Sequence, residues 1–65
     1  MTDITIIVHN TGHWSNLVIA SDTALVITPS GTSDISPSMA WELVSYCAAR
    51  PADYTITNND DNRSN

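Results

Sequence analysis

Two histidines are the residues best suited to bind a metal. His9 and His13 flank the turn-forming sequence Asn10-Thr11-Gly12. Zinc takes three or four ligands in proteins, and the other candidates in reach are Cys47 and Asp34. Histidines in loops are more often polar turn residues, so we expect no metal and no cofactor. A metal-binding domain that uses His9 and His13 remains a third hypothesis.

No nucleophile has the setting that catalysis requires. Cys47 is the single cysteine, and a reactive cysteine needs a histidine partner and an exposed, electropositive environment. The serines lack a G-x-S-x-G elbow, and the stretch 28–32 lacks the lysine of a phosphate-binding loop. We therefore expect a protein that is not an enzyme. One cysteine also excludes an intrachain disulfide, which fits a reducing cytoplasm.

Charge is the most unusual property of the chain. It carries seven acidic residues, two arginines and no lysine, for a net charge of −5. Such a chain repels the phosphate backbone, so we expect no direct nucleic-acid binding and a basic protein surface as partner. The alternative is that the acidity only keeps a small protein soluble. The acids are Asp3, Asp22, Asp34, Glu42, Asp53, Asp60 and Asp61.

The first half of the chain is typical of a small antiparallel sheet. Three runs rich in β-branched residues predict strands that form a meander. Turn residues separate them, and the proline and glycine of the stretch 29–34 predict a loop. The expected strands are Asp3–His9, Trp14–Ala20 and Thr23–Thr28.

One helix is predicted at Ser36–Arg50. Ser36 is a suitable N-cap, Pro37 is suited to the first helical position, and Pro51 ends the helix. Helical spacing predicts a buried stripe on one side of this helix. Trp41 lies away from that stripe, where it either anchors a partner or folds over the sheet edge or onto Tyr54. The stripe consists of Met39, Ala40, Leu43, Val44 and Cys47.

These elements predict one α+β domain over residues 1–57, with a three-stranded antiparallel meander packed against one helix. Tyr54–Thr57 is a possible short fourth strand or an extended arm. Residues 58–65 have nothing to bury and are expected to form a disordered polar tail. A helix covers only one face of a sheet. The expected covered face holds Ile4, Ile6, Val8, Leu17, Ile19, Leu25 and Ile27, and the other face holds Ile7, Val18, Ala20, Ala24 and Val26.

The predicted topology also sorts the charges. With the helix antiparallel to the third strand, Asp3, Asp22 and Asp53 meet at the end where the helix finishes. His9, His13 and Asp34 would lie at the opposite end. Acids are mildly unfavourable near a helix C-terminus, so this grouping indicates a role in binding rather than in stability.

The stretch DITIIVHNTGHWSNLVIASDTALVITPSG, followed by SPSMAWELVSYCAA, resembles the small phage-encoded anti-CRISPR proteins, most nearly those directed at the type I-C system. The likeness covers nearly the whole ordered chain and lies in size, pattern and charge. Several such proteins are similar to DNA in their charge distribution. The resemblance implies a non-catalytic inhibitor in the cytoplasm of the bacterial host. It would bind a basic DNA-binding surface of a CRISPR effector (Cascade) subunit and block target DNA binding.

Carried over to this chain, the partner-binding positions are Asp3, Asp22 and Asp53, with Asp34, Glu42 and the exposed Trp41 as further candidates. A second hypothesis is a structural or assembly module that acts through the apolar second face of the sheet. That face would also suit a homodimer, because a domain of this size gains from additional burial. No segment has the features of a signal peptide or a membrane span, so no membrane partner is expected.

Overall fold

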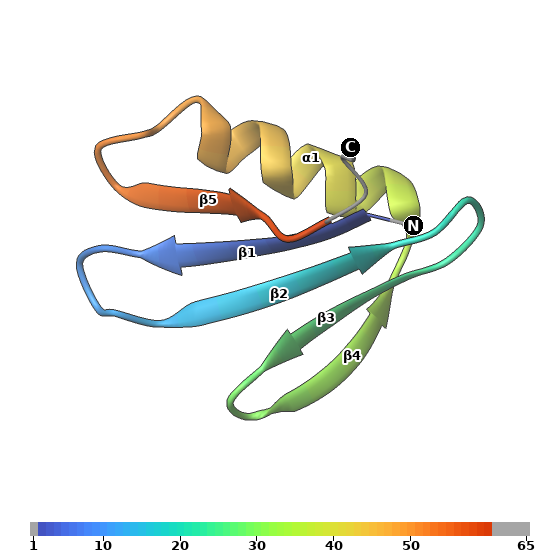
Figure 1. Ribbon diagram of the computed structural model, residues 1–65. Helices are drawn as coiled ribbons and strands as arrows, with labels where there is room; N and C mark the ends of the chain where they lie inside the picture. Colours follow the sequence, from blue (N-terminus) through green and yellow to red (C-terminus); the bar gives the residue numbers. More distant parts are fainter. Residues whose placement is uncertain (1, 61–65) are drawn as a thin grey trace.

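The computed structural model describes residues 2–60, which form a five-stranded antiparallel sheet and one helix (Figure 1). This confirms the expected α+β class and the packing of one helix on a sheet. The elements are β1 (Thr2–Val8), β2 (Trp14–Ile19), β3 (Ala24–Thr28), β4 (Gly31–Ile35), α1 (Pro37–Ala48) and β5 (Tyr54–Asn58).

The strand order is β4-β3-β2-β1-β5. The first four strands form a meander of antiparallel hairpins, and the chain then crosses one face of the sheet as α1. It returns as β5, which pairs antiparallel with the free edge of β1. The possible strand at Tyr54–Thr57 is thereby confirmed and extends to Asn58.

The loop predicted over residues 29–34 is wrong beyond residue 30, because Gly31 begins β4. Thr28 pairs with Gly31 across the two-residue turn Pro29-Ser30, and Gly31 has a φ of 142°, which other residues rarely adopt. The Thr28 hydroxyl accepts from the Ser30 N–H at 3.2 Å and donates to the Gly31 carbonyl at 3.2 Å. As a short edge strand that is largely exposed, β4 needs no apolar pattern, so its composition is that of a loop.

The additional strand reverses the direction of the helix. β4 returns the chain to the end of the sheet where β1 begins, since Ile35 pairs with Ala24. The helix therefore starts there and finishes near the end of β1, where β5 begins opposite Val8 (Figure 1). Its expected direction, antiparallel to β3, is wrong for this reason.

The predicted start of the helix is confirmed, whereas its last residue is Ala48 and not the predicted Arg50. The Ser36 hydroxyl accepts from the Met39 N–H at 3.2 Å, and Pro37 occupies the first turn. The last turn closes with the Ala49 N–H bonded to the Ser45 carbonyl at 3.1 Å, ahead of Pro51. Ser36 therefore caps the start as expected, and the helix has already ended when the chain reaches Pro51.

The core lies between the helix and one face of the sheet, and Leu17 is its only large side chain with no exposed surface among residues 2–60. Two side-chain predictions are wrong. The register pairs Leu17 with Val26, so β3 turns Ala24 and Val26 inward instead of Leu25 and Ile27. Met39 and Leu43 lie outside the core. The buried residues are Ile4, Ile6, Leu17, Ile19, Ala24, Ala40 and Cys47.

The tail predicted from residue 58 begins too early, because Asn58 belongs to β5 and the next two residues bond to β1. The Asn59 N–H donates to the Asp3 carbonyl at 2.7 Å. The Asp3 N–H donates to the Asp60 carboxylate at 3.1 Å. The remainder of the predicted tail, 61–65, lies outside the described residues.

Candidate interaction surface

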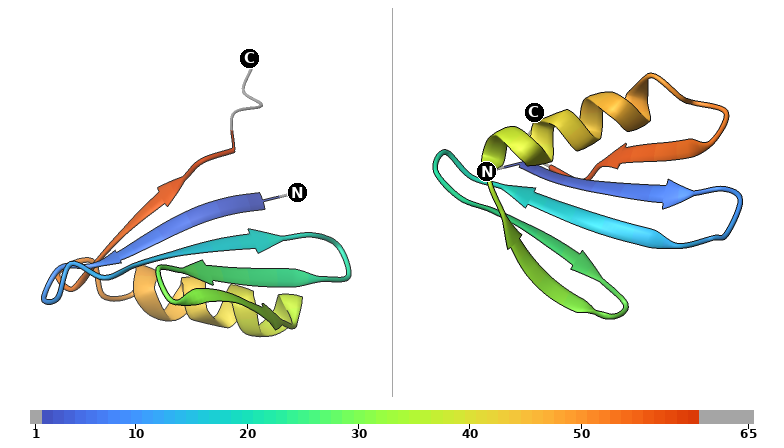
Figure 2. Two further views of the ribbon diagram at one scale, coloured as in Figure 1. Left: turned by 90° about the horizontal axis from the view of Figure 1, so that it is seen from below. Right: turned by 180° about the vertical axis from the view of Figure 1, so that it is seen from behind.

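The helix covers one face of the sheet and leaves the opposite face, here called the open face, without a covering element in the described part of the chain (Figure 2). Side chains alternate along each strand, so the register fixes which residues share this face. Its members are Asp3, Thr5, Ile7, Trp14, Asn16, Val18, Leu25, Ile27, Thr32, Asp34, Thr55 and Thr57.

One cross-strand row of the open face carries a carboxylate on each side of an apolar pair. Asp3 pairs with Val18, Val18 with Leu25, and Leu25 with Asp34. Val18 and Leu25 are half-buried, and Asp34 is exposed. The row therefore offers an apolar centre flanked by negative charge, which suits the aliphatic stem and charged head of lysine or arginine.

A polar cluster lies beside this row. The Asn59 side-chain amide donates to the Thr5 hydroxyl at 2.6 Å, and the Thr5 hydroxyl donates to the Asn16 side-chain oxygen at 2.9 Å. The same amide lies 3.4 Å from an Asp3 carboxylate oxygen. These contacts fix β5 against β1 and hold the Asp3 side chain in position on the open face.

Four acidic residues lie at the end of the sheet where β1 begins, here called the acidic end: Asp3, Asp22, Asp34 and Asp60. Asp22 lies in the turn between β2 and β3, and Asp34 lies opposite Leu25 near the end of β4. Asp60 is bonded to the Asp3 backbone. Arg50 is the only lysine or arginine in the sequence between residues 2 and 60, and it follows the helix at the opposite end.

Acidic residues are grouped at one end of the sheet, as predicted, but the residues in the group differ from those predicted. Asp53 was expected at the acidic end and instead lies at the opposite end, because the helix runs the other way. Its carbonyl accepts from the His9 N–H at 2.9 Å. Asp34, expected beside the histidines, belongs to the acidic end because β4 returns the chain to that end.

This arrangement also changes the role of the helix dipole. The N-terminus of α1, not its C-terminus, lies at the acidic end, since Ser36 follows the last residue of β4. The partial positive charge there favours nearby carboxylates. The acids at this end are consequently compatible with folding. The prediction that they are unfavourable to folding, which assumed a nearby helix C-terminus, is wrong.

Glu42 and Trp41 belong to a separate surface. Both are exposed on α1, which packs on the face of the sheet opposite Asp3 and Asp34. Trp41 is 46% exposed. A partner bound to the open face would not reach these two side chains, so the six predicted binding residues divide among three places.

His9 has a structural role in the described chain. Its Nδ1 lies 3.1 Å from the Ala52 carbonyl, and its Nε2 is hydrogen-bonded to the Thr55 hydroxyl. These bonds join the end of β1 to the start of β5. Within residues 2–60, no group of three or more His, Cys, Asp or Glu side chains is placed to hold a metal ion.

Cys47 lies in the core, as its position on the helix predicts. Burial raises the pKa of its thiol, and the positive charge of Arg50 offsets part of this rise. A thiol in this state is a poor nucleophile at neutral pH, because the thiolate is the reactive form.

Sequence reasoning missed Asp60, which it assigned to the tail. The short strand Tyr54–Asn58 is the feature from which the position of Asp60 could have been predicted. A strand that pairs antiparallel with β1 and ends opposite Ile4 brings the following residues beside Asp3.

Comparisons with protein-family models, with curated proteins and with solved structures found no match. In the described residues, no helix has the length and apolar character needed to cross a membrane.

Proposed function

We propose that the protein is a non-catalytic acidic inhibitor that binds a basic, DNA-binding surface of another protein through its open face and acidic end. The observation that carries this proposal is the separation of charge along the sheet. Four carboxylates lie at one end, and the only arginine between residues 2 and 60 lies at the other.

The spacing of the carboxylates supports a surface that normally binds DNA. Asp3 and Asp34 lie on strands three positions apart in the sheet, and neighbouring strands are separated by about 4.8 Å. Their backbones are therefore about 14 Å apart, similar to the roughly 12 Å width of the DNA major groove. On a protein surface that binds the phosphates on both sides of a groove, Asp3 and Asp34 would place two carboxylates at a comparable separation.

The proposed target is a subunit of a CRISPR effector complex. The resemblance of the chain to small anti-CRISPR proteins supplies this target, and the absence of lysine favours a basic surface over nucleic acid. In this proposal the inhibitor and the target DNA compete for the same surface.

The test uses two charge reversals that change the net charge equally. Asp34→Lys alters the acidic end, and Asp53→Lys alters the opposite end. Both side chains are exposed, and lysine is well tolerated on an edge strand such as β4. The readout is inhibition of fluorescent target DNA binding by a purified type I-C effector complex. Circular dichroism checks that each variant folds.

We expect Asp34→Lys to weaken inhibition more than about tenfold, and the double variant Asp22→Lys/Asp34→Lys to abolish it. Asp53→Lys should retain inhibition within about twofold. Inhibition should also fall between low and high salt, since exposed charges are screened within about 10 Å at 0.1 M. Equal losses for Asp34→Lys and Asp53→Lys would contradict the assignment of the acidic end.

The apolar centre of the open face favours one alternative, an assembly module that binds an apolar partner. Val18, Leu25 and Ile27 are half-buried there, and Ile7 is 36% exposed. In that case Val18→Glu would abolish binding, while salt and Asp34→Lys would have little effect.

A further inference from the structure

The helix turns its small side chains toward the sheet and its large apolar side chains away from it. Ala40 and Cys47 are buried and Val44 is half-buried, whereas four larger residues are 41–61% exposed. A solvated helix normally has the reverse pattern, with polar side chains outside. The exposed residues are Met39, Trp41, Leu43 and Tyr46.

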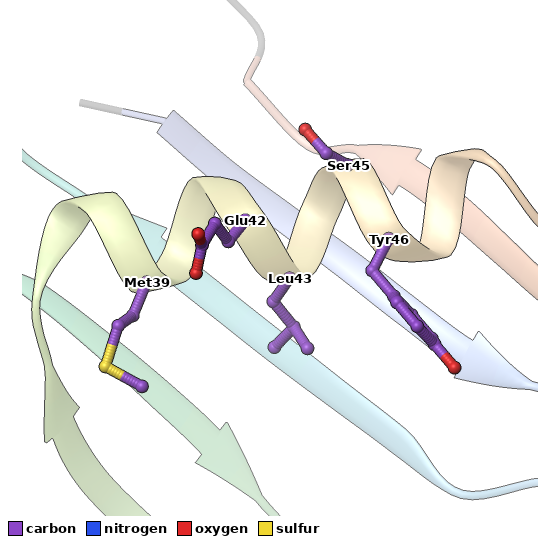
Figure 3. Close-up of a pocket in the computed structure, with 5 residues that line it drawn as sticks. All are labelled: Met39, Glu42, Leu43, Ser45 and Tyr46. Carbon is purple, nitrogen blue, oxygen red and sulfur yellow. The ribbon is translucent and has the colours of Figure 1, made fainter.

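Three of these residues form a continuous stripe, here called the helix stripe. Met39, Leu43 and Tyr46 follow one another at spacings of four and three residues, and Figure 3 shows them extending to the same side of the helix. With Glu42 and Ser45 they line a shallow hollow of about 520 Å³. Exposed apolar patches of this kind mark interaction sites.

The helix stripe ends at Arg50, the only arginine or lysine among residues 2–60. The Arg50 guanidinium carbon lies 3.7 Å from the centre of the Tyr46 ring, and its Nη1 donates to the Tyr46 carbonyl at 3.0 Å. Glu42 also lines the hollow and lies between Met39 and Leu43 along the helix (Figure 3). The stripe is thus apolar, with one acid toward its start and one base at its finish.

Such a surface is complementary to a second copy of itself in a two-fold, antiparallel arrangement. If the axis passes midway between Leu43 and Tyr46, Leu43 faces Tyr46 of the second copy. Measured along the helix, Glu42 then lies 2.5 residues from the axis. Arg50 of the second copy lies 5.5 residues from the axis on the same side. At a rise of 1.5 Å per residue their backbones are offset by about 4.5 Å along the helix, within reach of an ion pair.

The same arrangement is favourable over longer distances. It places the acidic end of each copy beside the Arg50 end of the other, and it sets the two helix dipoles antiparallel. By contrast, pairing through the open face about an axis along the strands would bring Asp3 and Asp34 of one copy against Asp34 and Asp3 of the other. Like charges at such a contact oppose association.

We infer that the protein forms a two-fold homodimer through the helix stripe, with Leu43 packed on Tyr46 and Glu42 paired with Arg50 across the interface. The dimer leaves both open faces accessible, so it does not depend on the proposed inhibitory function. It also adds the burial that a 65-residue chain lacks in isolation.

Sedimentation velocity over a range of protein concentrations tests this inference. The wild type should sediment as a species of twice the 7.0 kDa chain mass. Leu43→Glu should raise the dimer dissociation constant at least about 30-fold, because each dimer contains the substitution twice. Ile7→Glu is the matched control, an equally new charge on the open face, and should leave the constant unchanged.

A charge swap tests the antiparallel geometry and stays informative if Leu43→Glu fails to fold, since Glu42 is exposed. Glu42→Arg should weaken the dimer about tenfold, and Glu42→Arg/Arg50→Glu should recover most of that loss. A wild type that remains monomeric to about 1 mM would overturn the inference. Dissociation by Ile7→Glu, or no effect of Glu42→Arg, would overturn it equally.

Discussion

Replacing Leu17 by alanine should remove a large part of the stability of this domain. Leu17 has no exposed surface and lies at the centre of the core, paired with Ile4 on one side and Val26 on the other. A buried leucine truncated to alanine typically costs 2–5 kcal/mol through lost burial and the remaining cavity, so we take about 3 kcal/mol. At roughly 0.05–0.15 kcal/mol per residue, a chain of this length has about 3–10 kcal/mol in total.

Leu25→Ala is the matched control, because the same substitution is made on the next strand but on the open face. Leu25 is half-buried beside Asp34, so we expect a cost of about 1 kcal/mol. Thermal and urea unfolding followed by circular dichroism give both values at one protein concentration. At about 4–8 °C per kcal/mol, Leu17→Ala should lower Tm by roughly 12–24 °C and Leu25→Ala by less than half of that.

The comparison decides which residues of β3 point inward. An equal or larger loss for Leu25→Ala would mean that β3 turns Leu25 and Ile27 toward the helix. The register that pairs Leu17 with Val26 would then be refuted.

Three further substitutions test the elements that fix the helix, the β1–β5 edge and the core thiol. Ser36→Ala should cost about 1 kcal/mol in urea unfolding by removing the bond to the Met39 N–H, whereas Ser38→Ala in the first turn should cost less. His9→Ala should raise hydrogen exchange at β5 amides such as Thr55 by separating β5 from β1, while His13→Ala should not. Cys47 should react with a thiol reagent at least about 100-fold faster in urea than in buffer, and equal rates would contradict its burial. Burial raises the pKa of this thiol in the folded protein above its value in the unfolded chain. The contribution of Cys47 to the free energy of unfolding is therefore complete below the pKa of the unfolded chain, and it is lost as the pH rises toward the pKa of the folded protein. Cys47→Ala should therefore reduce the loss of stability at alkaline pH, which pH-dependent unfolding would measure.

Much of the fold could be predicted because several residues have a single physical interpretation. The β-branched runs of β1, β2 and β3 indicate strands, and Ser36, Pro37 and Pro51 define the two ends of the helix. The short apolar alternation at Tyr54–Thr57 was enough to suggest an additional strand. These signals are local, so the sequence contains them in full.

The remaining features depend on partners elsewhere in the chain. Polar β4 is a strand because β3 supplies its hydrogen bonds, and no apolar pattern marks it. The run Ala24–Ile27 is apolar at every position, so alternation alone does not say which side faces the core. The register with β2 decides it.

The candidate site shows the same limit. The acids were identified from composition, but their grouping depends on the direction of the helix, and the unpredicted β4 reversed that direction. Asp53 was misplaced for this reason, and Asp34 was assigned to the wrong end because β4 itself was not predicted. Asp60 was missed because its neighbour in space, Asp3, is 57 positions away in the sequence.

The central claim, that the protein occupies a DNA-binding surface, predicts mutual exclusion with DNA. The most direct measurement is the apparent Kd of the labelled protein for a purified type I-C effector complex at increasing concentrations of target DNA. If both ligands use one surface, the apparent Kd should rise in proportion to DNA without a plateau, and no complex containing all three components should form. A constant Kd, or a stable complex of protein, effector and DNA, would contradict the account.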